Sequence, residues 1–276
     1  MQESFVVGAL TSPWRVGWRR LDLISQLVAR DLAQRHRGSL LGGLWSFVHP
    51  LAMLVIFTFV LTQVFHARWP GAPPTAPVPF FAVMVFCGIV VFTIFSESLT
   101  RACTVIIANA NLVKRVVFPL EVLPVVSVLG ALVTGAYGLA ALLAVSCVVS
   151  GPPPLTVLLL PLPIVPLVLW TLGLSWLVSA LGVFVRDLSY GIGIVLQALY
   201  FLSPVLYTAE QVPAWAQPIV RMNPLSVTIE GARRVLVLGQ LPGWRGLGLA
   251  TAAGAVVAMA GFAFFQRAKR GFADVL

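Results

Sequence analysis

The chain has 276 residues, 59% of them hydrophobic and only 10% charged, with 18 basic residues against 9 acidic ones. A soluble domain carries about 25% charged residues, so this composition argues against a soluble protein and indicates a lipid environment. The basic residues lie between apolar runs and form no aromatic-interleaved stripe, which argues against nucleic-acid binding. The three cysteines lie in or beside apolar runs without CxxC spacing, so we expect neither a disulfide nor a metal site.

Residues 14–37 are predicted to form an amphipathic helix that lies in the membrane interface. Trp18, Leu21 and Val28 recur at helical spacing, whereas Arg19 and Arg30 fall on the opposite face. This pattern is typical of helices that bury one face among lipid headgroups. The alternative is an ordinary soluble helix packed on a core, but the rest of the chain predicts no soluble core.

Six apolar runs follow, each near the length of about 20 residues that crosses a bilayer as a helix. The predicted spans cover residues 40–65, 80–100, 122–149, 155–185, 188–207 and 246–266. The helical pattern of the second span continues to residue 110. In the fourth span, prolines crowd the first half and predict a regular helix only from near Pro163.

Residues 208–245 are too polar and too rich in proline to span a membrane, yet they contain short apolar pieces. We predict short re-entrant helices there, covered by protein or facing a water-filled cavity. A plain extracytoplasmic loop is the alternative. The predicted fold is therefore a single all-α polytopic membrane domain over residues 1–276, with a six-span core at 40–266 and a tail at 267–276.

The basic residues divide unequally between the two sides of such a chain. If six spans alternate, 13 of the 18 basic residues face the side that holds both termini, and 5 face the other side. The positive-inside rule then predicts that both termini are cytoplasmic.

Motifs for energy conversion within the chain are missing from the sequence. It contains no GxxxxGK[ST] phosphate loop, no H-E-x-x-H motif and no paired carboxylates, so we expect no catalytic residues. Glu97 is the one acid well inside an apolar run, and Arg101 follows at the spacing of a helical ion pair. Glu230 with Arg233 and Arg234 repeats the arrangement, and we predict structural ion pairs, chiefly Glu97–Arg101 and Glu230–Arg234, rather than a proton relay.

The sequence NLVKRVVFP, residues 111–119, interrupts the apolar pattern on the predicted cytoplasmic side. It is short, basic and apolar at once, which favours an amphipathic helix presented to a partner below the membrane. The alternative is a turn at the membrane surface with basic anchors.

Six segments, taken in chain order, carry a resemblance to a known family. They are RDLAQRHRGSLLGGLWSFVHPL, NANLVKRVVFPLEVLP, the RDL after the fourth span, LSPVLY with VPAW downstream, NPLSVTIEGAR and the closing FADVL. This ordered set, from about Arg30 to Leu276, resembles the transmembrane subunit of the ABC-2 exporters of polysaccharide and O-antigen, which include teichoic acid and capsule export permeases.

The resemblance implies a homodimer in a bacterial cytoplasmic (inner) membrane, with two separate ATP-binding subunits docked below it. It implies that this chain binds no cofactor, that ATP and Mg lie on the partner subunit, and that residues 210–238 form re-entrant helices. It also implies a lipid-linked glycan as substrate, usually carried on undecaprenyl diphosphate. The coupling helix that receives the motion of the ATPase would consist of Leu112, Val113, Lys114, Arg115, Val116, Val117 and Phe118.

The site residues for such a substrate follow from charge and from aromatic content. Arg35 and Arg37, at the cytoplasmic mouth of the first span, suit a diphosphate by charge-assisted hydrogen bonds, although Arg37 equally suits a lipid headgroup. Glycines in the segments 38–42 and 190–193 would allow close helix approach. Candidates for a glycan conduit are the aromatic residues Trp45, Phe57, Phe92, Tyr190, Tyr200 and Phe201.

The predicted function is export of a lipid-linked polysaccharide by an ATP-driven ABC permease. An ABC-2 exporter of a small amphiphile or drug shares this topology, and a proton-coupled lipid-glycan flippase is a second alternative. A membrane-embedded glycosyl- or phosphotransferase would need clustered acidic residues for a metal, and the 9 acids of the chain form no such cluster.

Overall fold

The computed structural model describes residues 13–35, 44–64, 66, 80–113 and 118–276. These residues form helices and turns, without a strand among them, so the predicted all-α fold is confirmed for this part of the chain. The helices are α1 Pro13–Arg35, α2 Trp45–Phe59, α3 Phe80–Ala108, α4 Ala110–Val113, α5 Val122–Ser150, α6 Pro161–Phe184, α7 Leu188–Leu202, α8 Gln217–Met222, α9 Pro224–Leu236, α10 Trp244–Ala268 and α11 Phe272–Val275.

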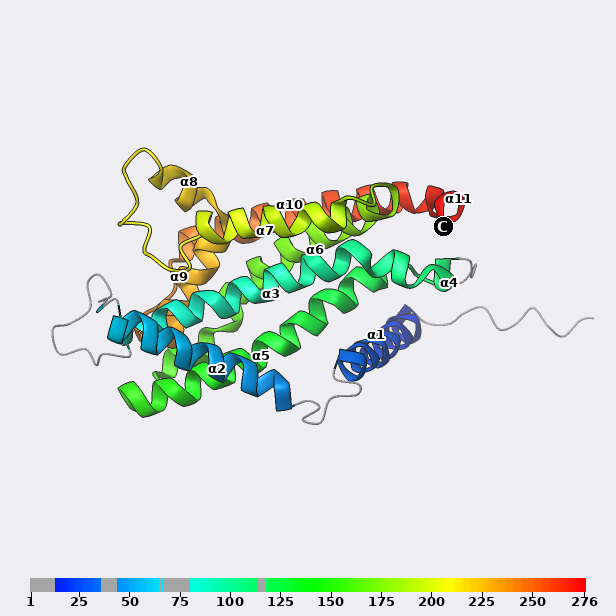
Figure 1. The fold of residues 1–276 in the computed structure, drawn as a ribbon. Helices are drawn as coiled ribbons and strands as arrows, with labels where there is room; N and C mark the ends of the chain where they lie inside the picture. The colour runs from blue at the N-terminus through cyan, green and yellow to red at the C-terminus, as the bar shows by residue number, and fades with distance from the viewer. Residues whose placement is uncertain (1–12, 36–43, 65, 67–79, 114–117) are drawn as a thin grey trace, which may run out of the picture.

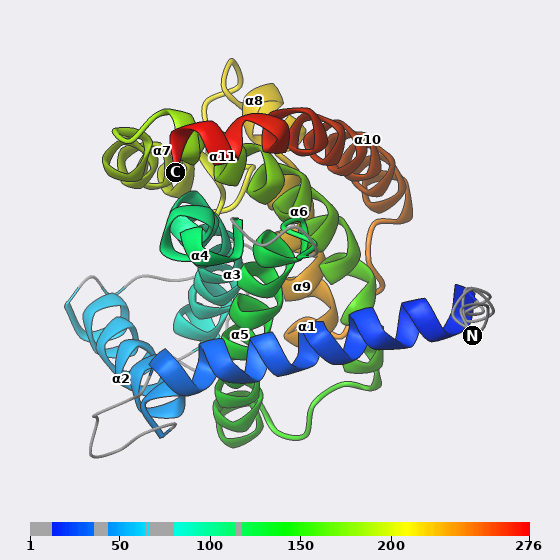
Figure 2. The same cartoon turned by 90° about the vertical axis from the view of Figure 1, so that its right-hand side faces the viewer.

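The long helices run side by side along one direction (Figure 1). Helices α4 and α11 lie at one end of this bundle, and α8 and α9 lie toward the opposite end. Helix α1 does not follow the common direction but crosses the bundle over α5 (Figure 2). This placement fits its sequence, because an amphipathic helix has one apolar face to cover rather than a whole apolar surface.

Within the described part of the chain, four helical segments are long and apolar enough to cross a membrane: Phe80–Ala108, Val122–Val148, Leu155–Phe184 and Trp244–Val275. They correspond to the second, third, fourth and sixth predicted spans. The helices at the first and fifth predicted spans are shorter apolar helices, at Pro50–Phe59 and Leu188–Leu202.

Helix α3 forms the centre of the bundle and contacts α5, α6, α7 and α9. Its side chains provide many of the buried apolar residues, among them Val83, Phe86, Val91 and Phe95. A helix that is apolar around most of its circumference buries well only when neighbours surround it, as they do here.

Helices α6 and α10 pack closely together, and glycine makes the approach possible. A Cβ built on Gly261 would overlap the backbone of Gly173, and a Cβ on Gly173 would lie 2.5 Å from the carbonyl oxygen of Val257. Small residues let helix backbones approach in membranes, where packing rather than water drives association.

Two predicted boundaries differ from the structure. The fifth span was expected to reach residue 207, but α7 ends at Leu202, because Ser203 is extended and Pro204 cannot donate a backbone hydrogen bond. The regular helix of the fourth span begins at Pro161 rather than near Pro163, since proline is well suited to the first helical turn. A 3₁₀ turn, Leu155–Leu159, precedes it.

Candidate functional site

A network of four charged residues joins the end of α1 to α3. Arg35 Nη1 lies 2.6 Å from Glu97 Oε1, and Arg35 Nη2 lies 2.6 Å from Asp31 Oδ2. Arg101 Nε lies 2.9 Å from the same Glu97 oxygen, and Arg101 Nη1 lies 3.7 Å from Asp31 Oδ1. Arg35 also donates a 2.7 Å hydrogen bond to Thr134 Oγ1 on α5. Three helices therefore meet at one guanidinium group.

The formal charges of this network cancel, because two arginines face two carboxylates. The side chain of Arg35 is 8% exposed, whereas that of Arg101 is 36% exposed. Arg35, expected to bind a diphosphate, is thus occupied by protein partners in this structure, and Arg101 is the more accessible cation. Arg37, the other expected diphosphate ligand, lies outside the described residues.

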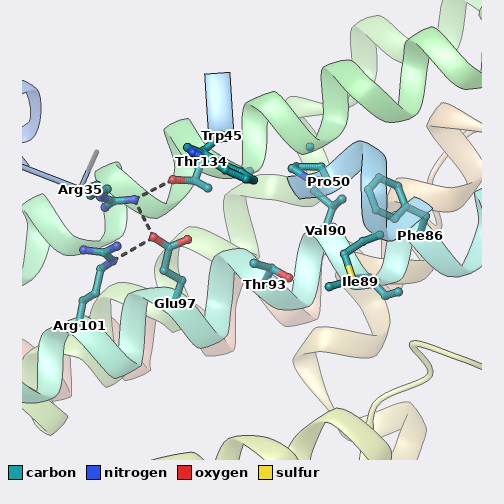
Figure 3. Close-up of a pocket in the computed structure, with 13 residues that line it drawn as sticks. Arg35, Trp45, Pro50, Phe86, Ile89, Val90, Thr93, Glu97, Arg101 and Thr134 are labelled. Carbon is teal, nitrogen blue, oxygen red and sulfur yellow. Dashed lines mark hydrogen bonds and ion pairs between the residues drawn. The ribbon is translucent and has the colours of Figure 1, made fainter. Parts of the chain in front are cut away.

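The network closes one end of a cavity of about 450 Å³ between the end of α1 and helices α2, α3 and α5. Figure 3 shows Arg35, Arg101 and Glu97 together at that end, with Thr134 beside them. Toward the other end the lining becomes apolar, with Pro50, Phe86 and Ile89.

The middle of the cavity is lined by Trp45 and Thr93, on α2 and α3 (Figure 3). Trp45, a predicted conduit residue, begins α2 and is 46% exposed. The cavity therefore offers a charged end, an aromatic wall and an apolar end in one volume, the arrangement required by a molecule with a charged head and a hydrocarbon tail.

Sequence reasoning missed two members of this site, Asp31 and Thr134. Asp31 carried a signal, since it precedes Arg35 by four residues on a predicted helix, the spacing of an ion pair. Thr134 lies on another helix, and its hydrogen bond to Arg35 spans 99 positions in the sequence. No local sequence pattern predicts such a contact.

A second buried cation lies near the opposite end of the bundle. Arg233 on α9 is 0% exposed, and its guanidinium donates to the carbonyl oxygens of Met84 (2.9 Å), Pro204 (2.8 Å) and Val205 (2.6 Å). Gly88 leaves room for the group, since a Cβ there would lie 2.9 Å from Arg233 Nη2. The charge is stabilised by carbonyl groups of the non-helical turn after α7 and by one carbonyl group of α3.

The two arginines of α9 thus differ in role. Arg234 Nε lies 3.3 Å from Glu230 Oε1, the pair expected from the sequence. Arg233 was expected to share that cluster; its side chain turns into the protein and donates hydrogen bonds to backbone carbonyls. Adjacent residues on a helix point about 100° apart, so only one of the two can face the bundle in this way.

The predicted coupling segment is described in part. Leu112 and Val113 end α4, Phe118 is not helical, and Lys114, Arg115, Val116 and Val117 lie outside the described residues. The residue before a proline avoids the helical conformation, which explains why Phe118, before Pro119, is not helical. Leu112, Val113 and Phe118 pack against a buried apolar cluster that contains Ile106 and Phe272.

The remaining predicted conduit residues fall in different places. Phe92 on α3 is buried against Tyr200 on α7, with ring centroids 5.0 Å apart, and Tyr200 also contacts Phe201 at 5.5 Å. Tyr190 lies at the other end of α7 and is 83% exposed, and Phe57 is half-buried on α2. The structure therefore brings together three of the six aromatic residues.

Comparisons with known proteins agree with these features. Residues 22–237 match the family model of the ABC-2 type transporter. The chain is 27% identical to an O-antigen export system permease protein RfbA of Klebsiella pneumoniae, over 92% of this chain and 95% of that protein. It is 26% identical to the RfbA permease of Myxococcus xanthus, over 91% and 94%. It is 25% identical to the polysialic acid transport protein KpsM of Escherichia coli, over 79% and 82%.

Proposed function

The chain belongs to the ABC-2 type transporter family, and we propose that it is the permease subunit of an ATP-driven exporter of lipid-linked polysaccharide. The observation that carries this proposal is the similarity, over more than nine tenths of the chain, to permeases named for O-antigen export. As a transport component the chain works with a separate ABC ATPase, which holds the ATP and Mg. The exporter of a small amphiphile and the proton-coupled flippase gain no support from these relatives.

We infer a six-span topology in which α2 and α7 cross the membrane together with the four longer helices. Helix α2 is extended at its end by a π-helical turn, Val60–Val64, which adds to its length. Helices α8 and α9 then form the re-entrant segment. Support comes from Arg233 of α9, whose bonds to backbone carbonyls satisfy groups that lipid could not.

The orientation follows from the positive-inside rule applied to the bundle ends. Helices α4 and α11 share one end (Figure 1). Arg267, Lys269 and Arg270 come directly before α11 in the chain. Arg186, at the start of α7, is exposed. These clustered basic residues support a cytoplasmic location for this end of the bundle. Both termini would then be cytoplasmic, with the chain in a bacterial inner membrane.

The permease functions as a homodimer in this proposal. Helix α7 exposes Tyr190, Ile194 and Phe201, although it is one of the shorter apolar helices. A Cβ built on Gly191 or Gly193 would meet no atom within 4 Å, so a second helix can approach closely there. The matching face of a second copy would cover these residues, and the glycines at 38–42, outside the described residues, would serve the same purpose on the first span.

The cavity beside α1 is the proposed entrance for the lipid carrier. An isoprenoid chain suits the apolar end, and a diphosphate suits the charged end, where Arg101 is the more accessible cation. A phosphate group that approaches Arg101 and Arg35 would compete with Glu97 and Asp31 for the same guanidinium groups. Binding of the headgroup would then loosen the contact between α1 and α3.

A matched pair of substitutions tests this entrance. Thr93 is exposed within the cavity, and Thr100 is exposed two turns later on the same helix but does not line it. We expect Thr93→Trp to fill the cavity and reduce export of the glycan to the cell surface at least several-fold, while Thr100→Trp retains it. The amount of permease in the membrane and its capture of the ATPase subunit should be equal for both variants. Equal export by both variants would contradict the proposed entrance.

A further inference from the structure

The end of the bundle that carries α4 also carries the C-terminal helix. Figure 2 looks onto this end and shows α11 near α4. Both contribute to one apolar cluster, in which Phe272 is fully buried and Leu112, Val113 and Phe118 are partly buried. The last residues of the chain are thus packed with the segment expected to receive the motion of the ATPase.

Phe272 fixes α11 to the long helices α6 and α10. Its ring lies 5.8 Å from that of Phe184 and 5.6 Å from that of Phe265, measured between centroids. Burial of an aromatic side chain of this size stabilises the docked position of a short helix that would be unstable alone. The tail is therefore a docked element.

Polar contacts tie the same region to the start of α5. Lys269 Nζ lies 3.4 Å from Glu121 Oε2, and Trp176 Nε1 on α6 donates a 3.0 Å hydrogen bond to the carbonyl oxygen of Glu121. Glu121 follows Phe118 by three residues, so α6, the tail and the predicted coupling segment are held against one another.

We propose that α11 and α4 form one docking surface for the ATP-binding subunit. This inference rests on the proposed function. Asn111 of α4 and Asp274 and Val275 of α11 are exposed on elements whose apolar sides share the cluster around Phe272. A subunit that contacts α4 at this end of the bundle meets α11 as the continuation of the same surface. Its motion would reach α6 and α10 directly through Phe272, in addition to α3 and α5.

Site-specific photo-cross-linking in the assembled transporter tests this surface. The probe is p-benzoylphenylalanine, placed at Asn111, at Asp274, or at Phe264, which is exposed on the side of α10. We expect cross-links to the ATP-binding subunit from positions 111 and 274 and none from position 264. Cross-linking from 111 without cross-linking from 274 would overturn this inference and leave the proposed function standing. If no ATP-binding subunit co-purifies at all, the proposed function itself fails.

A pair of valine substitutions provides an independent measurement. Val275 is 44% exposed on α11, and Val148 is 87% exposed at the far end of α5. We expect Val275→Glu to weaken capture of the ATP-binding subunit about tenfold, because an unpaired charge in an interface must lose its water. Val148→Glu should leave capture unchanged. Equal capture by both variants would contradict a role of α11 in docking.

Discussion

Arg35 Nη1 and Glu97 Oε1 lie 2.6 Å apart and join residues separated by 62 positions in the sequence. This contact links the end of α1 to the middle of α3, the central helix of the bundle. Helix α1 otherwise packs mainly on α5, along an open apolar groove lined by Val28, Leu32 and Val133. The position of α1 therefore depends on a few charges near its last turn.

Removal of Arg35 should detach α1. Arg35→Ala leaves Asp31 and Glu97 without their closest cation, and breaking a largely buried pair costs about 3 kcal/mol or more. We expect a lower melting temperature in detergent and faster proteolysis between α1 and α2. Arg30→Ala, on an exposed position of the same helix, is the control and should change neither.

A double variant with reversed charges tests the Arg35–Glu97 ion pair separately from the neighbouring charged residues. Glu97→Arg combined with Arg35→Glu restores the attraction between the two positions but sets the new carboxylate beside Asp31. Stability should thus recover only in part. If each single variant already has wild-type stability, this ion pair does not hold α1.

Arg233 should be the most sensitive cation between α7 and α10. Arg233→Met removes the donors to the carbonyl groups of Pro204 and Val205, and each buried acceptor left unpaired costs about 1–3 kcal/mol. Arg233→Lys should lose less stability than Arg233→Met, because the charge remains but a single ammonium group reaches fewer carbonyl groups.

The control is Arg234→Met, since the side chain of Arg234 is 40% exposed and its ion pair is worth little. The measurement is the melting temperature of the purified chain and its yield in the membrane. Equal losses for Arg233→Met and Arg234→Met would contradict the assignment of Arg233 as a buried anchor.

Gly261 should tolerate no side chain, because α6 and α10 meet there. Gly261→Leu forces the two backbones apart and should cost at least about 1–3 kcal/mol, the usual range for overpacking. Gly248→Leu lies on the same helix at a position where a Cβ would meet no atom within 4 Å, and it should fold normally. Size-exclusion chromatography of the tagged chain reports the folded fraction, and a normal profile for Gly261→Leu would refute this packing.

The coupling segment can be tested without a structure of its middle residues. The triple change of Lys114, Arg115 and Phe118 to Ala should abolish capture of the ATP-binding subunit while the chain still inserts. Phe118 packs beside Leu112 on the cluster around Phe272, so its loss also removes support from the segment. Retained capture and ATPase activity would place coupling elsewhere in the chain.

The sequence predicted the helices well because each long apolar run has one favourable state in lipid. It predicted less well where tertiary contacts decide the outcome. In the sequence, Arg35 belongs to a basic stretch and suggests a free cation. In the structure it forms an ion pair with Glu97 on a distant helix. Arg233 and Arg234 are identical residues side by side, and only the packing of α9 against α3 determines which one is buried.

The end of α7 shows the same limit on a shorter scale. Leu199 to Tyr207 is apolar enough to continue the span, but Pro204 ends the helix and exposes carbonyl groups that need a donor. That donor comes from Arg233, 28 residues after Val205. The local break was readable from the proline, whereas the partner that makes the break tolerable was not.

The most direct test of the central claim is glycan translocation by the chain co-purified with its ATP-binding subunit and reconstituted in lipid vesicles. The account predicts that lipid-linked glycan becomes accessible to a lectin on the opposite face only when ATP is supplied, and that a partner inactivated in its phosphate loop abolishes this movement. Translocation that proceeds without ATP and stops when a protonophore collapses the proton gradient would contradict it and would identify a proton-coupled flippase.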